Sequence, residues 1–176
     1  MSDHEQILTL FHALDQLPGP DHLEFPDTFD HALAKARAIQ LQDRLSSDLG
    51  HPCQLDDQTQ NASYTFKIAI PAEATEADVP LAVRLSNYGN FAVVTTPLPD
   101  SHADLDHAVR EDALSASDRD RIVSALYALG YTLIPQHLLH QRYTGVTWLA
   151  EDGTTHLSYG PHQGQATWWT RFFEHL

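Results

Sequence analysis

The stretch PDSHADLDHAVRED, residues 99–112, sets two histidines among five carboxylates. Imidazole and carboxylate groups transfer protons and bind divalent metals, so side chains of these types could do chemistry. If the stretch is helical, Asp104, His107 and Glu111 share one face, and the neighbouring members of this trio are spaced to hold a cation. The sequence therefore raises two possibilities: a metal or acid–base site, and a strongly hydrated surface segment.

The hydrated surface is the favoured interpretation. A calcium loop starting at Asp104 would need glycine at Val109 and glutamate at Ser115, so that pattern fails. Carboxylates without a positive partner are costly to bury, which favours an exposed segment that docks cationic groups. We predict that the following acidic side chains contact a partner: Asp100, Asp104, Asp106, Glu111 and Asp112. The alternative is a metal-binding protein or metal-dependent enzyme that uses His102, Asp106 and His107.

Signatures of other reactions are missing from the chain. It has 12 histidines but no H-E-x-x-H motif, and His137 with His140 in HLLH lacks the glutamate of a zinc site. No G-x-S-x-G, phosphate loop or G-x-G-x-x-G occurs. The single cysteine, Cys53, excludes an internal disulfide and a cysteine zinc cluster, and a buried thiol is favoured over a nucleophile. We predict a protein that is not an enzyme, with no cofactor and no catalytic residue.

The charge balance points to the kind of partner. Ten Lys and Arg residues face 24 Asp and Glu residues, a formal net charge of −14. Such a surface repels nucleic-acid phosphates and anionic lipids and attracts basic proteins. We expect no direct contact with nucleic acid or membrane and a basic partner protein, with DNA- or RNA-binding proteins among the candidates. Solubility alone also explains the charge, and an immunity-type inhibitor of a cationic toxin is a further alternative.

Composition and the N-terminal residues bound the class of protein. Hydrophobic residues make up 42% of the chain and charged residues 19%, which is typical of a globular domain. MSDHEQILTL is acidic rather than basic, so no signal peptide is predicted, and no run of about 18 apolar residues is present. We expect a soluble cytoplasmic protein with one domain over residues 1–176, to which an N-terminal helix at residues 1–20 is appended.

Helix-start and helix-stop signals predict two helices in the first third of the chain. Ser2 and Glu5 form a capping box for the first. A second, long helix has Asp27 or Thr28 as its cap and ends at Gly50. Its apolar stripe drifts around the helix, as expected for a helix that lies across a twisted sheet.

Alternating apolar residues predict the strands that follow. ASYTFKIAI, residues 62–70, alternates with period two, and LAVRLSNYGNFAVVTT, residues 81–96, is a hairpin with its turn at 87–90. Shorter strands are predicted at 53–55 and 131–134. These segments predict an α+β fold in which an antiparallel meander sheet of about four to six strands is packed by the long helix.

Helices dominate the second half of the chain. A short helix is predicted around residues 104–113, and another at 135–140. Between them, Ser117 with Asp120 in the reciprocal position predicts the start of a longer helix, which Gly130 ends.

The ending QATWWTRFFEHL predicts an aromatic terminal helix. Trp168 and Phe172 lie four residues apart, as do Trp169 and Phe173, so together they form a broad apolar face. The favoured interpretation is that this helix closes the protein's own core. The alternative is that Trp169 and Phe173 anchor an interface, because aromatic side chains concentrate binding energy.

From residue 28 onward, the order of long helix, antiparallel strands, helix, one or two strands and terminal helix resembles the bacterial type III secretion chaperone-like fold, which includes the YbjN-like proteins. The resemblance implies a small, acidic, non-catalytic protein that forms dimers and holds partners against exposed sheet or helix faces. The additional N-terminal helix and the aromatic ending depart from that pattern. A homodimer is also expected if FAVVTT or SYTFKIAI lies at a sheet edge, because a second copy would cover that edge.

Overall fold

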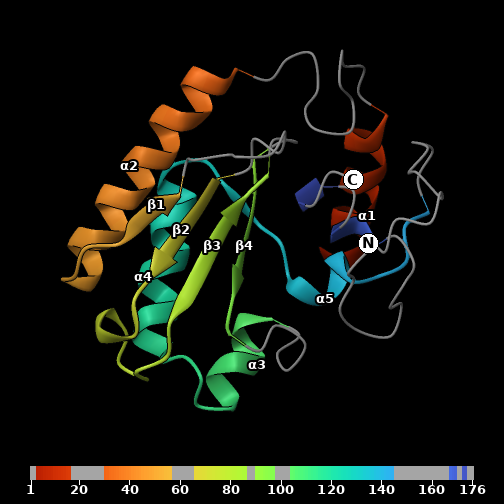
Figure 1. Ribbon diagram of the computed structural model, residues 1–176. Coiled ribbons are helices and arrows are strands. Elements are labelled where there is room, and N and C mark those ends of the chain that lie inside the picture. The colour runs from red at the N-terminus through yellow and green to blue at the C-terminus, as the bar shows by residue number, and fades with distance from the viewer. Residues whose placement is uncertain are drawn as a thin grey trace, which may run out of the picture.

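The computed structural model describes residues 3–16, 30–56, 66–86, 90–97, 104–144, 167–169 and 172–173. Within these ranges the helices are α1 (Asp3–Asp15), α2 (His31–Leu49), η1 (Ala72–Ala74, a 3-10 turn), α3 (Leu105–Arg110), α4 (Ala116–Ala128) and α5 (Gln136–Leu139). The strands are β1 (Gln54–Asp56), β2 (Phe66–Ile70), β3 (Leu81–Leu85), β4 (Phe91–Thr95) and β5 (Thr132–Leu133). Figure 1 shows α2 and α4 on one side of the sheet and α1 and α5 beside β4.

The five strands form one sheet in the order β1-β2-β3-β4-β5. The first four make an antiparallel meander, and β5 joins β4 in parallel. The predicted α+β fold is confirmed, with the difference that its last strand is not antiparallel. The physical reason is the connection: between β4 and β5 the chain passes through α3 and α4, and such a crossover returns a strand in the same direction.

Neither of the two apolar strands lies at an edge of this sheet. β2 pairs with β1 and β3, and β4 pairs with β3 and β5. The edges are β1 and β5, which have three and two residues. The sequence argument for a homodimer required an apolar edge strand, and these pairings remove that argument.

The main hydrophobic core lies between the sheet and the helices α2 and α4 (Figure 1). On β2 and β3 every second side chain is buried, in the alternation expected of strands with one covered face. The long helix contributes Ala38, Leu41, Leu45 and Leu49, and α4 contributes Ile122, Ala125 and Leu126. Leu33 and Ala36 lie in the first turns of α2, before its buried stripe begins, and are exposed.

A second hydrophobic cluster packs against the other face of β4. All five residues of β4 are buried, because Ala92 and Val94 face the main core while Phe91 and Val93 face this cluster. Its other buried members come from α1, the residue after β5, α5 and the C-terminal residues: Phe11, Ile134, Leu138, Leu139, Trp168, Phe172 and Phe173. The interpretation that the C-terminal aromatic residues close the protein's own core is confirmed for Trp168, Phe172 and Phe173.

Two predicted helix caps need comment. The N-cap of α2 is Asp30, whose carboxylate accepts a hydrogen bond from the Leu33 backbone N–H at 3.0 Å. Asp27 and Thr28 lie outside the described residues, as does Ser2. The prediction that Ser117 caps α4 is wrong, because Ser115 Oγ accepts from the Asp118 N–H at 3.0 Å and has the extended backbone of a cap. Gly50, with φ of 74°, ends α2 as predicted.

Candidate functional site

A cleft of about 740 Å³ lies between α1, α3, α4 and β5. Four carboxylates line it, from Asp3 on α1, Asp104 and Asp106 at the start of α3, and Asp120 on α4. The rest of its lining is largely apolar: Ile7, Leu10, Val94, Leu105, Val123, Tyr127, Leu133, Ile134 and Pro135. We call this hollow the acidic cleft. An apolar floor under a rim of like charges is suited to a ligand that carries both apolar and cationic groups.

Helix geometry and one arginine fix the carboxylates of the acidic cleft. Asp104 is the N-cap of α3, and its Oδ1 accepts from the His107 N–H at 2.8 Å. Arg119 donates to Asp106 at 2.6 Å and to Asp120 at 3.0 and 3.2 Å. The hydrogen bonds that Arg119 donates to Asp120, and then the one to Asp106, raise the pKa of its guanidinium. This bridge ties α3 to α4, and it leaves the carboxylates of the cleft in excess over its one guanidinium.

Two large apolar side chains of the acidic cleft are open to solvent. Leu10 is 38% exposed and Tyr127 is 67% exposed. The other large apolar residues of the described chain with comparable exposure, Leu33 and Ile39, both lie on α2. Exposed apolar groups lose contact with water when a partner covers them, so Leu10 and Tyr127 supply surface that binding could bury.

The structure brings together only part of the predicted acidic set. Asp104 and Asp106 line the acidic cleft, but Glu111 and Asp112 follow α3 and do not. Glu111 lies 3.8 Å from His107 Nε2, and Asp112 is exposed with φ of 58°. Asp100 lies outside the described residues, as does His102 of the metal hypothesis.

Sequence analysis missed Asp3, Asp120, Leu10 and Tyr127 as members of one site. In the sequence, Asp120 is only part of a predicted helix cap, and Leu10 is one apolar residue of the predicted N-terminal helix. They come from two helices far apart in the sequence, α1 and α4, which the fold brings together, so their spacing along the sequence carries no signal. Tyr127 lies outside the buried face of α4, which Ile122, Ala125 and Leu126 form.

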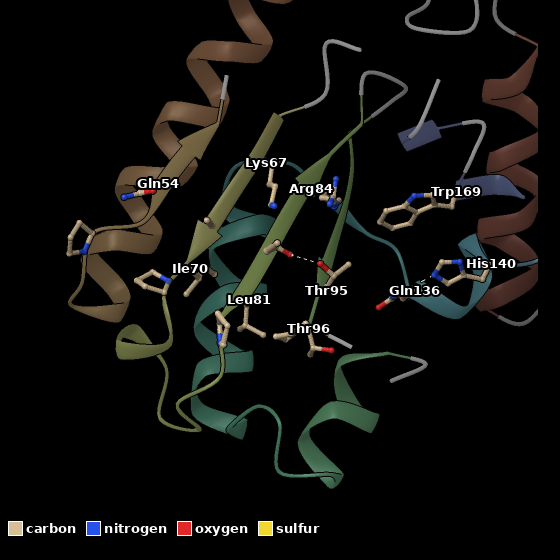
Figure 2. A pocket seen from close by; sticks show the side chains of 16 residues that line it. Gln54, Lys67, Ile70, Leu81, Arg84, Thr95, Thr96, Gln136, His140 and Trp169 are labelled. Carbon is tan, nitrogen blue, oxygen red and sulfur yellow. Dashed lines mark hydrogen bonds between the residues drawn. The ribbon is translucent and has the colours of Figure 1, made fainter. Parts of the chain in front are cut away.

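The predicted aromatic anchors occupy different environments. Phe173 is 5% exposed and packs within the second cluster, stacked on Trp169 with ring centroids 5.1 Å apart. Trp169 is partly exposed and lines a different hollow, of about 620 Å³, over the open face of β1, β2 and β3 (Figure 2). Of this predicted pair, Trp169 alone keeps surface for a partner.

Two further predictions concern the thiol of Cys53 and a metal site. Cys53 is 3% exposed, and burial raises the pKa of its thiol while a hydrogen bond with Ser46 acts in the opposite direction. Across the described ranges, no three His, Cys, Asp or Glu side chains gather closely enough to hold a metal ion.

Comparison with known proteins found no relative of this chain. No family model, no curated protein and no solved structure matches the chain. No helix in the described part of the chain combines the length and the apolar character that crossing a bilayer requires.

Proposed function

We propose that this protein is a non-enzymatic binding module, chaperone-like or regulatory, that docks a basic partner protein in the acidic cleft. The observation that carries the proposal is the combination at one place of four carboxylates with exposed Leu10 and Tyr127. The −14 net charge of the chain extends the same field beyond the cleft.

Each part of the acidic cleft has a separate physical role. The carboxylates attract a cationic segment and orient it, an effect that acts mainly on the association rate and on specificity. The apolar lining and Tyr127 provide affinity, because a few buried aromatic and aliphatic side chains supply most of the binding free energy at an interface. The partner segment that fits carries Lys or Arg beside apolar side chains. Proteins that bind DNA or RNA are a common basic class, and a cationic toxin meets the same requirement.

Affinity capture from lysate with three forms of the full chain tests the charge requirement. The cleft variant carries Asp3→Lys and Asp120→Lys. The control carries Asp43→Lys and Glu73→Lys, two exposed carboxylates on α2 and η1 that do not line the cleft. Both variants change the net charge equally, and the cleft variant in addition loses the hydrogen bonds between Arg119 and Asp120. We expect the wild type and the control to retain the same basic proteins at low salt, and the cleft variant to lose them.

A second pair of variants tests the apolar requirement. Tyr127→Ala removes exposed surface inside the cleft, and Leu33→Ala removes exposed surface on α2. Tyr127→Ala should weaken binding of the captured protein about 10-fold or more, as expected for an aromatic anchor, and Leu33→Ala should leave binding unchanged. Equal capture by the wild type and the cleft variant, or no protein enriched by any form at low salt, contradicts the proposal.

A further inference from the structure

The open face of the sheet carries a hollow whose charge is opposite to that of the chain. We call it the sheet groove; it has a volume of about 620 Å³ and lies over β1, β2 and β3 (Figure 2). Among the described residues that line it are Lys67, Arg84 and His140, and none of them is an Asp or a Glu. In a chain with 24 carboxylates and ten Lys and Arg residues, a lining of this kind is a local reversal of charge.

Strand register places the two cations side by side. Lys67 on β2 is the direct partner of Arg84 on β3, and both side chains stand on the open face. Figure 2 shows them next to each other in the groove, with Trp169 beyond Arg84. Like charges directly opposite one another on a sheet repel, so an anion placed between them would relieve an unfavourable contact.

The surroundings of Lys67 leave room for such an anion. Asp56 on β1 is the register partner of Lys67 on its other side, but Asp56 is exposed and does not line the groove. Among the described residues Lys67 forms no ion pair. The Lys67 ammonium is therefore available to an incoming negative group.

An aromatic wall holds Arg84 in place. Its guanidinium carbon lies 5.6 Å from the centroid of the Trp169 ring. Trp169 in turn stacks on Phe173 and on His140, with ring centroids 5.1 and 5.5 Å apart. A guanidinium fixed over an aromatic ring keeps its planar set of donors, which matches the two oxygens of a carboxylate.

Beside the two cations the floor of the groove is apolar and low. In the next register row on the same face, two residues along each strand, Ala69 faces Ala82, and small side chains at these positions leave space above the sheet. Pro71, Pro80 and Thr95 border this space. The groove thus has a cationic end formed by Lys67 and Arg84 and an uncharged end formed by the alanines.

We propose that the sheet groove binds a small organic anion, with its anionic head between Lys67 and Arg84 and its apolar body over Ala69 and Ala82. The volume lies in the range of about 300–1,000 Å³ that small-molecule sites occupy. The charge complementarity selects an anion, and the apolar floor selects one with a hydrocarbon part over a bare inorganic ion. Among the described lining residues this site shares Gln136 alone with the acidic cleft, and it does not depend on the function of that cleft.

The first test compares two probes of the same shape. The full chain, labelled for NMR, is titrated at fixed ionic strength with 4-phenylbutyrate and with its neutral amide, 4-phenylbutyramide. The carboxylate should shift the methyl signals of Ala69 and Ala82 and the indole N–H of Trp169, and should bind about 10-fold more tightly than the amide. Equal binding of the two probes, or no shift at these signals with millimolar carboxylate, overturns the proposal.

The second test assigns the preference to the two cations. Lys67→Gln and Arg84→Gln should each weaken 4-phenylbutyrate binding about five-fold or more while leaving the amide unaffected. Arg44→Gln is the matched control, because Arg44 lies on α2, which covers the other face of the sheet. Equal weakening by Arg44→Gln would overturn the assignment, and so would unchanged binding in both groove variants. The wild-type comparison of the two probes stands even if a groove variant does not fold.

Discussion

Burial determines the ionisation of Tyr131, the residue between α4 and β5. The side chain is 7% exposed, and burial raises the pKa of its phenol to about 12. The Arg37 guanidinium, 5.7 Å from the centre of the ring, acts in the opposite direction. In the unfolded chain the phenol has a pKa of about 10, so the two states bind different numbers of protons at alkaline pH.

We predict that Tyr131 makes the protein lose stability between pH 10 and pH 12. Below pH 10 the phenol is protonated in both states and has no effect, whereas above it the unfolded chain ionises first and is favoured. From pH 9 to pH 11 the free energy of unfolding should fall by about 1 kcal/mol more in the wild type than in Tyr131→Phe. Urea unfolding of both proteins across this range measures the difference. Parallel pH profiles would contradict the shifted pKa.

Asp118 shows why residue type alone does not reveal a role. Its side chain is fully buried, and its two oxygens accept hydrogen bonds from the Glu76 N–H at 2.7 Å and from Arg121 at 3.0 Å. The carboxylate thereby ties the segment after η1 to the start of α4. Its neighbour Asp120 is exposed and lines the acidic cleft. Nothing in the local sequence distinguishes the structural aspartate from the one in the candidate site.

At the scale of elements, only one of two nearby serines of equal capping propensity caps the start of α4. Both Ser115 and Ser117 precede an apolar helical pattern, and an acidic residue follows each of them three positions later. Only Ser115 has the extended backbone and accepts a hydrogen bond from the helix, whereas Ser117 lies exposed inside the first turn. The position of the preceding turn after α3 decided between them.

Ser115→Ala should therefore lower the free energy of unfolding by about 1 kcal/mol, the usual cost of losing an N-cap side chain. Ser117→Ala should change it by less than about 0.5 kcal/mol, because an exposed serine in a helix contributes little. Chemical denaturation of the two variants and the wild type makes the comparison. An equal loss in both variants would show that the hydrogen bond to Ser115 is not what stabilises this helix end.

Strands were predictable as elements, but not all of their pairings were. Period-two alternation identified β2, β3 and β4 because each of them has at least one face in a core. β5 has two residues, too few for a pattern to reveal its partner or its direction. Its parallel pairing follows from the path of the chain through α3 and α4, which is a property of the assembled fold.

At the scale of the whole molecule, α1 is part of the second hydrophobic cluster. Phe11 on α1 is fully buried, and its ring lies within 5.4 Å, centroid to centroid, of the rings of Phe91, Trp168 and Phe172. These contacts join α1 and the aromatic residues near the C-terminus to strand β4. The helix that the sequence predicts as an appended element is thus packed against the rest of the protein.

Phe11→Ala should destabilise the protein by about 3–5 kcal/mol, because it removes a buried aromatic ring and leaves a cavity. Leu10→Ala, one residue away on the exposed side of α1, should cost less than about 1 kcal/mol. Unfolding followed by near-UV and far-UV circular dichroism distinguishes the two variants. A small loss in Phe11→Ala would mean that α1 is dispensable for the core.

Net charge describes the molecule only on average. The −14 of the chain predicts an acidic surface, and the acidic cleft agrees with that prediction. The net charge gives no indication of the sheet groove, where Lys67 and Arg84 lie side by side because β2 and β3 pair in one particular register. A shift of that register by one residue would separate Lys67 from Arg84 and place one of them against the core.

The sequence by itself determined the elements of this protein, because helix caps, stop residues and apolar periodicity act over a few neighbouring residues. It also determined the sign of the overall field and placed Asp104 and Asp106 on the candidate binding surface. Only the tertiary structure decided which side chains share a site: Asp3 and Asp120 both line the acidic cleft, and Lys67 and Arg84 are register partners on adjacent strands. Contacts of this kind depend on chain path and strand register, which follow from packing the whole core at once and leave no local trace in the sequence.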